Sequence, residues 1–292
     1  MSVEILRYAA FVKDGRGGNP AGVVLDAADL PEAEMQRIAA DLNYSETAFV
    51  SPRHEPNVYD VRFFAPEQEV PFCGHATIAS AVALAERRPA NEMVFHTPAG
   101  LVTITTETGP DGLQAELTSV SPRVAEPPPG LVDLVLEALG WPRTDLDDRR
   151  PPMLANAGAQ HLLVFAATRE RLADLDYDFD ALAALMRQHD LVTVALVWRE
   201  SRRRYHARNP FAGSGVVEDP ATGAAAAALG GYLRETGEIK LTDTFTIEQG
   251  VDMGRPSLIE VSVIEGEPGV RVRGRAVEIG AYQLDGTGRP SS

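Results

Sequence analysis

An internal repeat is the feature of this chain that most constrains its fold. Residues His75–Leu84 align with Pro220–Leu229 at an offset of 145, and both segments are rich in Ala. Upstream, Tyr59–Arg62 matches Tyr205–Arg208 at an offset of 146 through a shared Tyr-x-x-Arg pattern. Ala-rich helices often coincide by chance, so the preceding strand match strengthens the case for duplication. We therefore expect two related halves, each with a strand followed by a buried helix.

Length, charge and cysteine content narrow the class of protein. The 292 residues exceed the usual size of one domain, and 44% hydrophobic residues suffice for two cores. A formal charge of −15 repels phosphate backbones, which argues against nucleic acid as a partner. The single cysteine excludes an internal disulfide, and the N-terminal residues lack a signal-peptide pattern. The least polar stretch, Ala221–Gly231, is too short for a membrane span. We expect a cytoplasmic protein with no membrane partner.

In the first half, hydrophobic periodicity and turn residues predict strands and two helices. Asp29 and Glu32 have the spacing of a capping box, and apolar residues with helical period follow as far as Asn43. Short apolar, β-branched runs bounded by turn residues indicate strands. The predicted strands include Val3–Val12, Ala21–Leu25, Thr47–Val50 and Asn57–Phe64, and His75–Arg88 is predicted as a buried helix.

The second half repeats this order of elements. Pro127-Pro128-Pro129 favours an extended conformation typical of a domain connector, so we place a boundary near it. A long helix is predicted over Ala221–Glu235, and a β-rich tail follows it. The last predicted strand covers about 276–285.

The two matching helix starts are the candidate site. They are Cys73-Gly74-His75-Ala76-Thr77 and Glu218-Asp219-Pro220-Ala221-Thr222. Unpaired N–H groups and the helix dipole favour a carboxylate or a developing oxyanion there. A dipole of this sign also lowers the pKa of Asp219 and disfavours a charged His75. The alternative is that His75 is a satisfied structural residue.

A third candidate is Glu46, which stands between a helix end and an apolar strand. Partial burial at a strand start would raise its pKa toward neutrality, so that it could take and return a proton as a general base. The alternative interpretation is a carboxylate on a surface turn.

Four short motifs together resemble the PhzF family of phenazine-biosynthesis isomerases. They are Gly18-Asn19-Pro20-Ala21-Gly22-Val23, Asn43-Tyr44-Ser45-Glu46-Thr47, Phe72-Cys73-Gly74-His75-Ala76-Thr77 and Glu218-Asp219-Pro220-Ala221-Thr222-Gly223. The resemblance implies the α+β diaminopimelate-epimerase-like fold. In that fold two pseudo-symmetric α/β halves each curve a mostly antiparallel sheet around a central helix, and the active site lies in the cleft between them. We expect halves at 1–125 and 126–292, with the last strand as a candidate to cross back to the first half.

The resemblance also implies roles for individual residues. Members of the family isomerise 2,3-dihydro-3-hydroxyanthranilate without cofactor or metal, and a glutamate moves a proton from ring C3 to C1. Glu46 occupies the place of that glutamate, while His75 and Asp219 match the residues that hold the polar groups of the substrate. The matching substrate contacts are Ser45, Gly74, Thr77, Thr222, Gly223 and Ala224. A homodimer is also implied. Family members that act on this substrate have a serine where this chain has Ala224, and loss of that hydroxyl is expected to change substrate preference.

Related epimerases and racemases use two thiols, one at each helix start, because inverting a stereocentre needs a base and an acid on opposite faces. Cys73 lies at or beside the first such position. The 145-residue offset puts Glu218 opposite Cys73 and places Pro220 about where the second thiol would lie. We therefore reject two-thiol racemisation and interpret Cys73 as a small buried residue.

The sequence thus predicts a cofactor-independent isomerase that moves a proton on a small carboxylate substrate, with Glu46 as general acid and base. A non-catalytic protein that binds or senses a small acid remains the alternative from another class. A lyase or hydratase that uses the same base is a third possibility.

Overall fold

The computed structural model describes residues 3–88 and 90–283 and divides into two compact units. Unit 1 consists of Met1–Thr118 and Arg273–Ser292, and unit 2 is Ser119–Val272. The chain first changes unit at residues 118 and 119, ahead of the expected boundary at 125 and 126. The reason is β9 (Arg123–Ala125), which pairs antiparallel with β10 (Met153–Asn156) of unit 2. Pro127–Pro129 therefore lies inside unit 2 and does not connect the two units.

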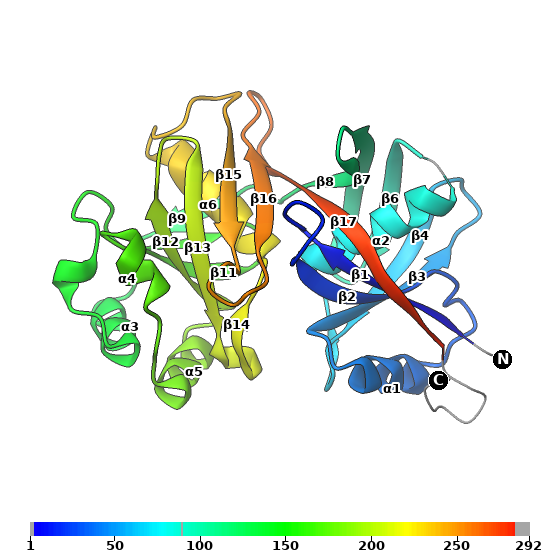
Figure 1. Ribbon diagram of the computed structural model, residues 1–292, viewed down its shortest axis with the longest axis horizontal. Helices are drawn as coiled ribbons and strands as arrows, with labels where there is room; N and C mark the ends of the chain where they lie inside the picture. Colours follow the sequence, from blue (N-terminus) through cyan, green and yellow to red (C-terminus); the bar gives the residue numbers. More distant parts are fainter. Residues whose placement is uncertain (1–2, 89, 284–292) are drawn as a thin grey trace. The chain divides into compact units, whose positions relative to one another are not determined.

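Unit 1 contains nine strands and two helices among its described residues (Figure 1). The strands are β1 (Glu4–Ala10), β2 (Asn19–Val24), β3 (Glu46–Pro52), β4 (Val58–Phe64), β5 (Glu69–Val70), β6 (Glu92–Thr97), β7 (Gly100–Gly109), β8 (Gly112–Thr118) and β17 (Arg271–Gln283). The helices are α1 (Glu32–Leu42) and α2 (Gly74–Arg87).

The strands of unit 1 close into a ring around α2. Pairings run from β1 through β2, β3, β4, β6, β7 and β8 to β17, which returns to β1. The pairs β2–β3 and β4–β6 are parallel, whereas β17–β1, β1–β2, β3–β4, β6–β7 and β7–β8 are antiparallel. Small side chains such as Ala76, Ala79 and Ala83 let α2 lie inside the ring against β1, β2, β3, β7 and β8. Its polar Thr77 and Ser80 donate hydrogen bonds to helix carbonyls, which satisfies both hydroxyls as donors.

Unit 2 repeats the order of the central strands and helix of unit 1, and its described residues form two more α-helices than those of unit 1. Its further strands are β11 (Gln160–Phe165), β12 (Thr193–Arg199), β13 (Arg204–Phe211), β14 (Val216–Asp219), β15 (Thr244–Gln249) and β16 (Ser257–Ser262). Its α-helices are α3 (Leu131–Leu139), α4 (Arg169–Ala173), α5 (Phe179–Gln188) and α6 (Gly223–Glu235). Helix α6 contacts β9, β10, β11 and β16, while α3 and α5 pack on a separate apolar cluster that includes Val164, Val194 and Leu196.

Strand pairing supports the duplication. In unit 1, β2 is parallel to β3, β3 antiparallel to β4, and β4 parallel to β6. In unit 2, β11 is parallel to β12, β12 antiparallel to β13, and β13 parallel to β15. Each parallel pair needs a crossover, and α2 and α6 belong to corresponding crossovers. The two units therefore share one topology.

The structural repeat has a different register from the one read in the sequence. Helix α2 begins at Gly74 and α6 at Gly223, an offset of 149 rather than 145. The difference of four residues is close to one helical turn, so the Ala periodicity looks similar in either alignment. At the structural offset, Glu69–Ala76 aligns with Glu218–Ala225. Thr222, not Glu218, is thus the counterpart of Cys73, and Thr222 rather than Pro220 occupies the second helix start.

Two helix starts differ from expectation. Pro31 is the N-cap of α1, and no side chain caps this end, so the capping box predicted from Asp29 is wrong. Helix α6 begins two residues after the predicted Ala221, because Asp219 ends β14 and the chain turns through Pro220. The predicted end of α1 is confirmed by Asn43, a left-handed C-cap with φ 51°.

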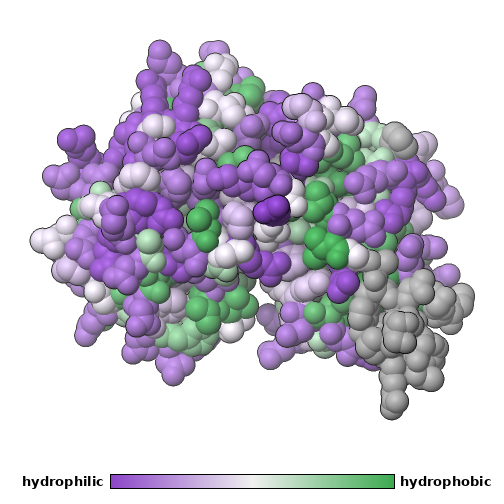
Figure 2. Space-filling view, viewed as in Figure 1, coloured by the Kyte–Doolittle hydropathy of each residue, from purple (hydrophilic) through white to green (hydrophobic). Residues whose placement is uncertain are grey.

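Hydrophilic side chains dominate the visible surface. Hydrophilic residues cover most of the face shown in Figure 2. Exposed large apolar side chains, among them Leu101, Val217 and Val251, come from separate parts of the chain. Across residues 3–88 and 90–283, no helix has both the length and the apolar character needed to cross a membrane. Residues 284 and 285 of the predicted last strand lie outside the described residues.

Candidate active site

The pairing of β2 with the start of β3 places the predicted base. Ala21 pairs with Glu46 in the parallel β2–β3 ladder, so Glu46 is the first residue of its strand. Gly22 makes the close approach possible. A Cβ there would lie 2.5 Å from Cδ1 of Leu42 and 2.7 Å from Oγ1 of Thr47. The Gly-Asn-Pro-Ala-Gly motif therefore has a packing role next to the candidate base.

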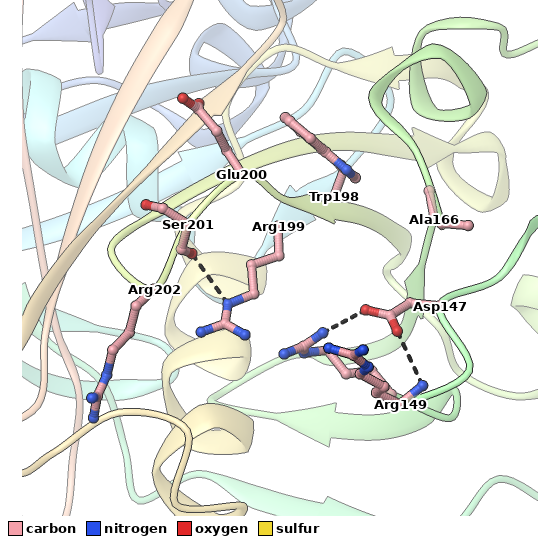
Figure 3. A pocket seen from close by; sticks show the side chains of 10 residues that line it. Asp147, Arg149, Ala166, Trp198, Arg199, Glu200, Ser201 and Arg202 are labelled. Atoms are coloured by element: carbon pink, nitrogen blue, oxygen red, sulfur yellow. Dashed lines mark hydrogen bonds and ion pairs between the residues drawn. The ribbon is translucent and has the colours of Figure 1, made fainter.

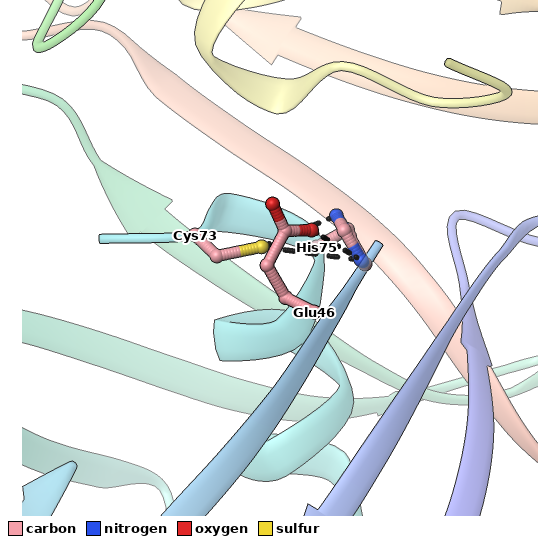
Figure 4. A group of neighbouring side chains, drawn as sticks. All are labelled: Glu46, Cys73 and His75. Atoms are coloured by element: carbon pink, nitrogen blue, oxygen red, sulfur yellow. Dashed lines mark hydrogen bonds and ion pairs between the residues drawn. The ribbon is translucent and has the colours of Figure 1, made fainter. Parts of the chain in front are cut away.

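Helix α2 brings Cys73 and His75 to the same point. Cys73 is the N-cap of the helix and His75 its second residue, so both side chains project from the first turn. Nε2 of His75 lies 3.5 Å from a carboxylate oxygen of Glu46 and 3.4 Å from Oγ of Ser45. Sγ of Cys73 lies 3.3 Å from Nδ1 of His75. Figure 4 shows Glu46, Cys73 and His75 converging on one another.

Burial controls the charge state of His75. It lowers the pKa of His75, while the Glu46 carboxylate and a hydrogen bond to the Pro20 carbonyl oppose that shift. The imidazole is therefore neutral at neutral pH and can act as donor through one nitrogen and acceptor through the other. The Glu46 side chain is only 13% exposed. A carboxylate at the edge of solvent beside a neutral imidazole is suited to proton transfer.

The remaining predicted residues of unit 1 lie in the same helix turn. Gly74 is half-buried and is the first residue of α2, where the helix leaves N–H groups without intrahelical partners. Thr77 is fully buried, and its hydroxyl donates to the Cys73 carbonyl over 2.7 Å. Thr77 thus stabilises the helix start.

In unit 2, Asp219 and Thr222 form a buried polar network with Gln249. Oγ1 of Thr222 donates to Oδ2 of Asp219 over 2.5 Å. The Gln249 amide donates to the Asp219 carbonyl and to the Thr222 hydroxyl, and its oxygen accepts from the Thr222 N–H. Gly223 is the buried first residue of α6, and Ala224 follows it half-buried. The network fixes the position of Asp219 just before the helix.

Sequence reasoning missed Gln249. The available signal was a glutamine that ends the apolar strand Thr244–Gln249 directly before Gly250. Gly250 has φ 71°, and a Cβ there would lie 2.8 Å from the Pro220 carbonyl oxygen. This glycine therefore lets the chain pass close to the Asp219–Pro220 turn.

The repeated Tyr-x-x-Arg pattern has a structural explanation. Nε and a terminal nitrogen of Arg62 donate to Glu69 at 2.7 and 2.6 Å. Arg208 makes the same two-pronged contact with Glu218 at 2.9 and 2.6 Å. In each unit, an arginine thus ties the central strand to the short strand that leads into α2 or α6. These pairs hold the segments that carry the helix starts.

A separate cavity of about 370 Å³ lies in unit 2 and is rich in arginine (Figure 3). Three of the lining arginines have partners: Arg150 contacts Asp147 and Glu238, Arg199 donates to the Ser201 carbonyl, and Arg202 pairs with Asp243. None of the predicted site residues lines this cavity. It therefore carries structural ion pairs and is not our candidate active site.

Comparison with known proteins identifies the family. The profile of the family described as phenazine biosynthesis-like protein matches residues 8–281. A trans-2,3-dihydro-3-hydroxyanthranilate isomerase from Pseudomonas fluorescens is 31% identical, with 96% of this chain and 94% of the relative covered. The chain belongs to the PhzF family and is an enzyme of the isomerase class.

Solved structures confirm the fold class. A PhzF-family phenazine biosynthesis protein from Bacillus anthracis superposes with a TM-score of 0.88 at 23% identity, covering 98% of this chain and 99% of that one. A hydroxyproline epimerase from Agrobacterium vitis, solved with bound trans-4-hydroxy-L-proline, gives a TM-score of 0.64 at 14% identity over 98% and 94% of the two chains. At these identities, the similarity establishes the α+β diaminopimelate-epimerase-like fold alone.

Proposed function

We propose that this chain catalyses proton transfer between two carbons of a small carboxylate substrate, with Glu46 as the general acid and base. The observation that carries the proposal is the contact of Glu46 with a neutral, buried His75 at 3.5 Å. A base held in this way can remove a proton from one carbon and return it to another, so the reaction balances within one molecule.

His75 is proposed to keep Glu46 productive. A neutral imidazole that donates a hydrogen bond to the carboxylate favours its charged form, which is the form that abstracts a proton. Ser45 contacts the same imidazole nitrogen at 3.4 Å, so the ring can alternate between two polar partners as the carboxylate gains and loses its proton. Asp219, Thr222, Gly223 and Ala224 remain predicted contacts to the polar groups of the substrate.

The proposed substrate class is a cyclic amino acid-like carboxylate that resembles trans-2,3-dihydro-3-hydroxyanthranilate. Similarity to the Pseudomonas fluorescens isomerase supports this class. Ala224 lacks the hydroxyl of the family's serine, and one hydrogen bond to a buried polar group is worth about 1–3 kcal/mol. We therefore expect a substrate preference that differs from that of the serine-containing enzymes.

A substrate panel tests the proposal. The native chain, Glu46→Gln and the surface control Glu67→Gln are incubated with trans-2,3-dihydro-3-hydroxyanthranilate and related small carboxylates. The products are separated by chromatography, and their molecular masses are measured by mass spectrometry. We expect an isomer of unchanged mass from the native chain and from Glu67→Gln. A product that has lost or gained water would indicate a lyase or hydratase instead.

The variant Ala224→Ser refines the substrate assignment. If the missing hydroxyl sets preference, restoring it should raise kcat/KM for trans-2,3-dihydro-3-hydroxyanthranilate by about 5- to 150-fold, which corresponds to about 1–3 kcal/mol. An unchanged kcat/KM across the panel would contradict a role for residue 224 in substrate choice.

A further inference from the structure

The cluster that holds the proposed base also has the composition of a transition-metal site. One ligand atom each from Glu46, Cys73 and His75 can be chosen so that all three lie within 4.8 Å of one another. Among the described residues, no other group of three or more His, Cys, Asp or Glu side chains brings its ligand atoms this close together. A thiolate, an imidazole and a carboxylate together favour Zn²⁺ or Co²⁺ over Mg²⁺ or Ca²⁺.

The distances agree with shared coordination. Zn–S bonds of about 2.3 Å and Zn–N or Zn–O bonds of about 2.0–2.2 Å, arranged tetrahedrally, put ligand atoms about 3.3–3.6 Å apart. Nε2 of His75 lies 3.5 Å from the Glu46 oxygen and 3.9 Å from Sγ of Cys73. Sγ of Cys73 lies nearer to Nδ1, at 3.3 Å, and all three ligand atoms lie within 4.8 Å of one another. The thiol would therefore swing from Nδ1 toward Nε2 and Glu46 to share one ion, and a water could take a fourth position.

Neighbouring groups add to the fit. When Nε2 binds a metal, the one N–H of the neutral His75 ring can donate to the Pro20 carbonyl, an arrangement that fixes the ring of a metal-binding histidine. Cys73 is 6% exposed and the Glu46 side chain 13%, so the ligands are largely shielded from competing water. Cys73 is also the only cysteine in the sequence, so the cluster holds the one thiol of the chain.

We propose that Glu46, Cys73 and His75 bind one Zn²⁺ ion and that this ion inhibits the enzyme. Binding would displace the thiol proton of Cys73 to solvent and form bonds to sulfur, to Nε2 and to a carboxylate oxygen. The same lone pairs of Glu46 and His75 serve the proton transfer, so the metal and the reaction exclude each other. The metal site rests on geometry alone, and only its inhibitory effect rests on the proposed function.

Cobalt spectroscopy on the full chain tests the metal site without any substrate. Co²⁺ bound to a thiolate gives a charge-transfer band, which in this protein can only come from Cys73. We expect the band to saturate at one equivalent, to disappear in Cys73→Ser and to be displaced by Zn²⁺. Glu46→Gln and His75→Gln should weaken binding at least about tenfold, whereas Glu67→Gln and His206→Gln should leave it unchanged.

Two results would overturn the site. One is no charge-transfer band in the folded native chain at millimolar Co²⁺. The other is a band whose affinity is the same in Glu46→Gln and His75→Gln, which would show a lone thiol acting by itself. Far-UV circular dichroism checks that each variant folds, and either of these two variants suffices for the comparison.

Turnover then tests inhibition separately. With the substrate identified by the panel, saturating Zn²⁺ should lower the rate at least tenfold, and a chelator should restore it. Binding of Co²⁺ and Zn²⁺ with an unchanged rate would refute inhibition while leaving the metal site standing. If no substrate turns over, the spectroscopic titration still decides the metal site.

Discussion

Thr222 is the residue that connects Asp219 to the rest of unit 2. Its hydroxyl donates to the Asp219 carboxylate and accepts from Gln249, and all three side chains are buried. At the structural offset, it stands where Cys73 stands in unit 1. Two equivalent helix starts thus carry a thiol beside an imidazole in one case and a hydroxyl beside a carboxylate in the other. The duplicated scaffold has become chemically asymmetric.

Replacing Thr222 with Val tests this network. The substitution keeps the shape but removes the hydroxyl that donates to Asp219 and accepts from Gln249, so the free energy of unfolding should fall by about 1–3 kcal/mol. Urea denaturation measures the change, and Thr105→Val on an exposed position of β7 serves as the control. Equal stability of Thr222→Val and the native chain would contradict the network.

His161 makes stability depend on pH. It is fully buried, contacts Thr193 at 2.8 Å, and its Nε2 is without a partner among the described residues. Burial lowers the pKa of His161 to about 3, whereas an unfolded histidine titrates near 6.5. Between these values, the unfolded chain binds a proton that the folded chain does not. The contribution of neutral His161 to stability is therefore complete above pH 6.5 and is lost as the pH falls toward 3.

Urea unfolding of the native chain and of His161→Gln at pH 7.5 and pH 5.0 tests this pH dependence. His161→Gln removes the titrating group, so the loss of stability between the two pH values should shrink by about 2 kcal/mol relative to the native chain. His75, whose pKa is also lowered, should leave part of the pH dependence in the variant. An identical pH dependence in both proteins would mean that His161 is not neutral in the fold.

At the scale of elements, α2 and α6 show what the sequence can and cannot reveal. Both helices were predictable because unbroken runs of small apolar residues indicate buried helices. Their register was not predictable, because a four-residue shift preserves helical periodicity in Ala-rich segments. Only the short strands that precede each helix, with Glu69 and Glu218 paired to their arginines, fix the offset of 149.

The candidate site was also predictable only in part. Glu46, His75 and Asp219 stand in short contiguous motifs, so the sequence could point to them. Gln249 accepts a hydrogen bond from the Thr222 N–H, 27 residues earlier in the chain, and no local sequence pattern reports that contact. The short helix α4 was also missed, since its five residues are too few to show a helical period. Contacts between distant segments are what the sequence leaves open.

Close packing of α6 predicts a strong effect at Gly231. A Cβ there would lie 2.3 Å from Cβ of Pro122. Alanine favours a helix over glycine by about 1 kcal/mol, but overpacking typically costs about 1–3 kcal/mol. Gly231→Ala should therefore lower the unfolding midpoint in urea, whereas Gly109→Ala, with neighbours no closer than 3.6 Å, should change it little. If Gly231→Ala instead stabilised the protein, Pro122 would have to move aside at little energetic cost.

At the scale of the whole molecule, β17 makes the fold depend on chain ends that are far apart in sequence. It pairs antiparallel with β1, from Glu4 opposite Gln283 to Ala10 opposite Ala276, and also with β8. Figure 1 shows the long strand beside β1. Unit 1 is therefore completed by residues that follow the whole of unit 2 in the chain.

Shortening the chain after Val272 tests this dependence. Amide hydrogens of β1 and β8 should lose their exchange protection, because their partner strand is gone. Both tryptophans, Trp141 and Trp198, lie in unit 2, so the fluorescence unfolding transition should persist. Protected β1 amides in the shortened chain would contradict the closed ring.

Solvent deuterium exchange tests most directly the central claim that Glu46 moves the proton. The native chain is incubated in D₂O with a carboxylate that it binds, and deuterium at carbon is followed by NMR. We predict incorporation by the native chain and by Glu67→Gln, and a rate at least about 100-fold lower in Glu46→Gln. Equal incorporation by the native chain and Glu46→Gln, or none with any carboxylate that binds, would contradict the proposed role of Glu46.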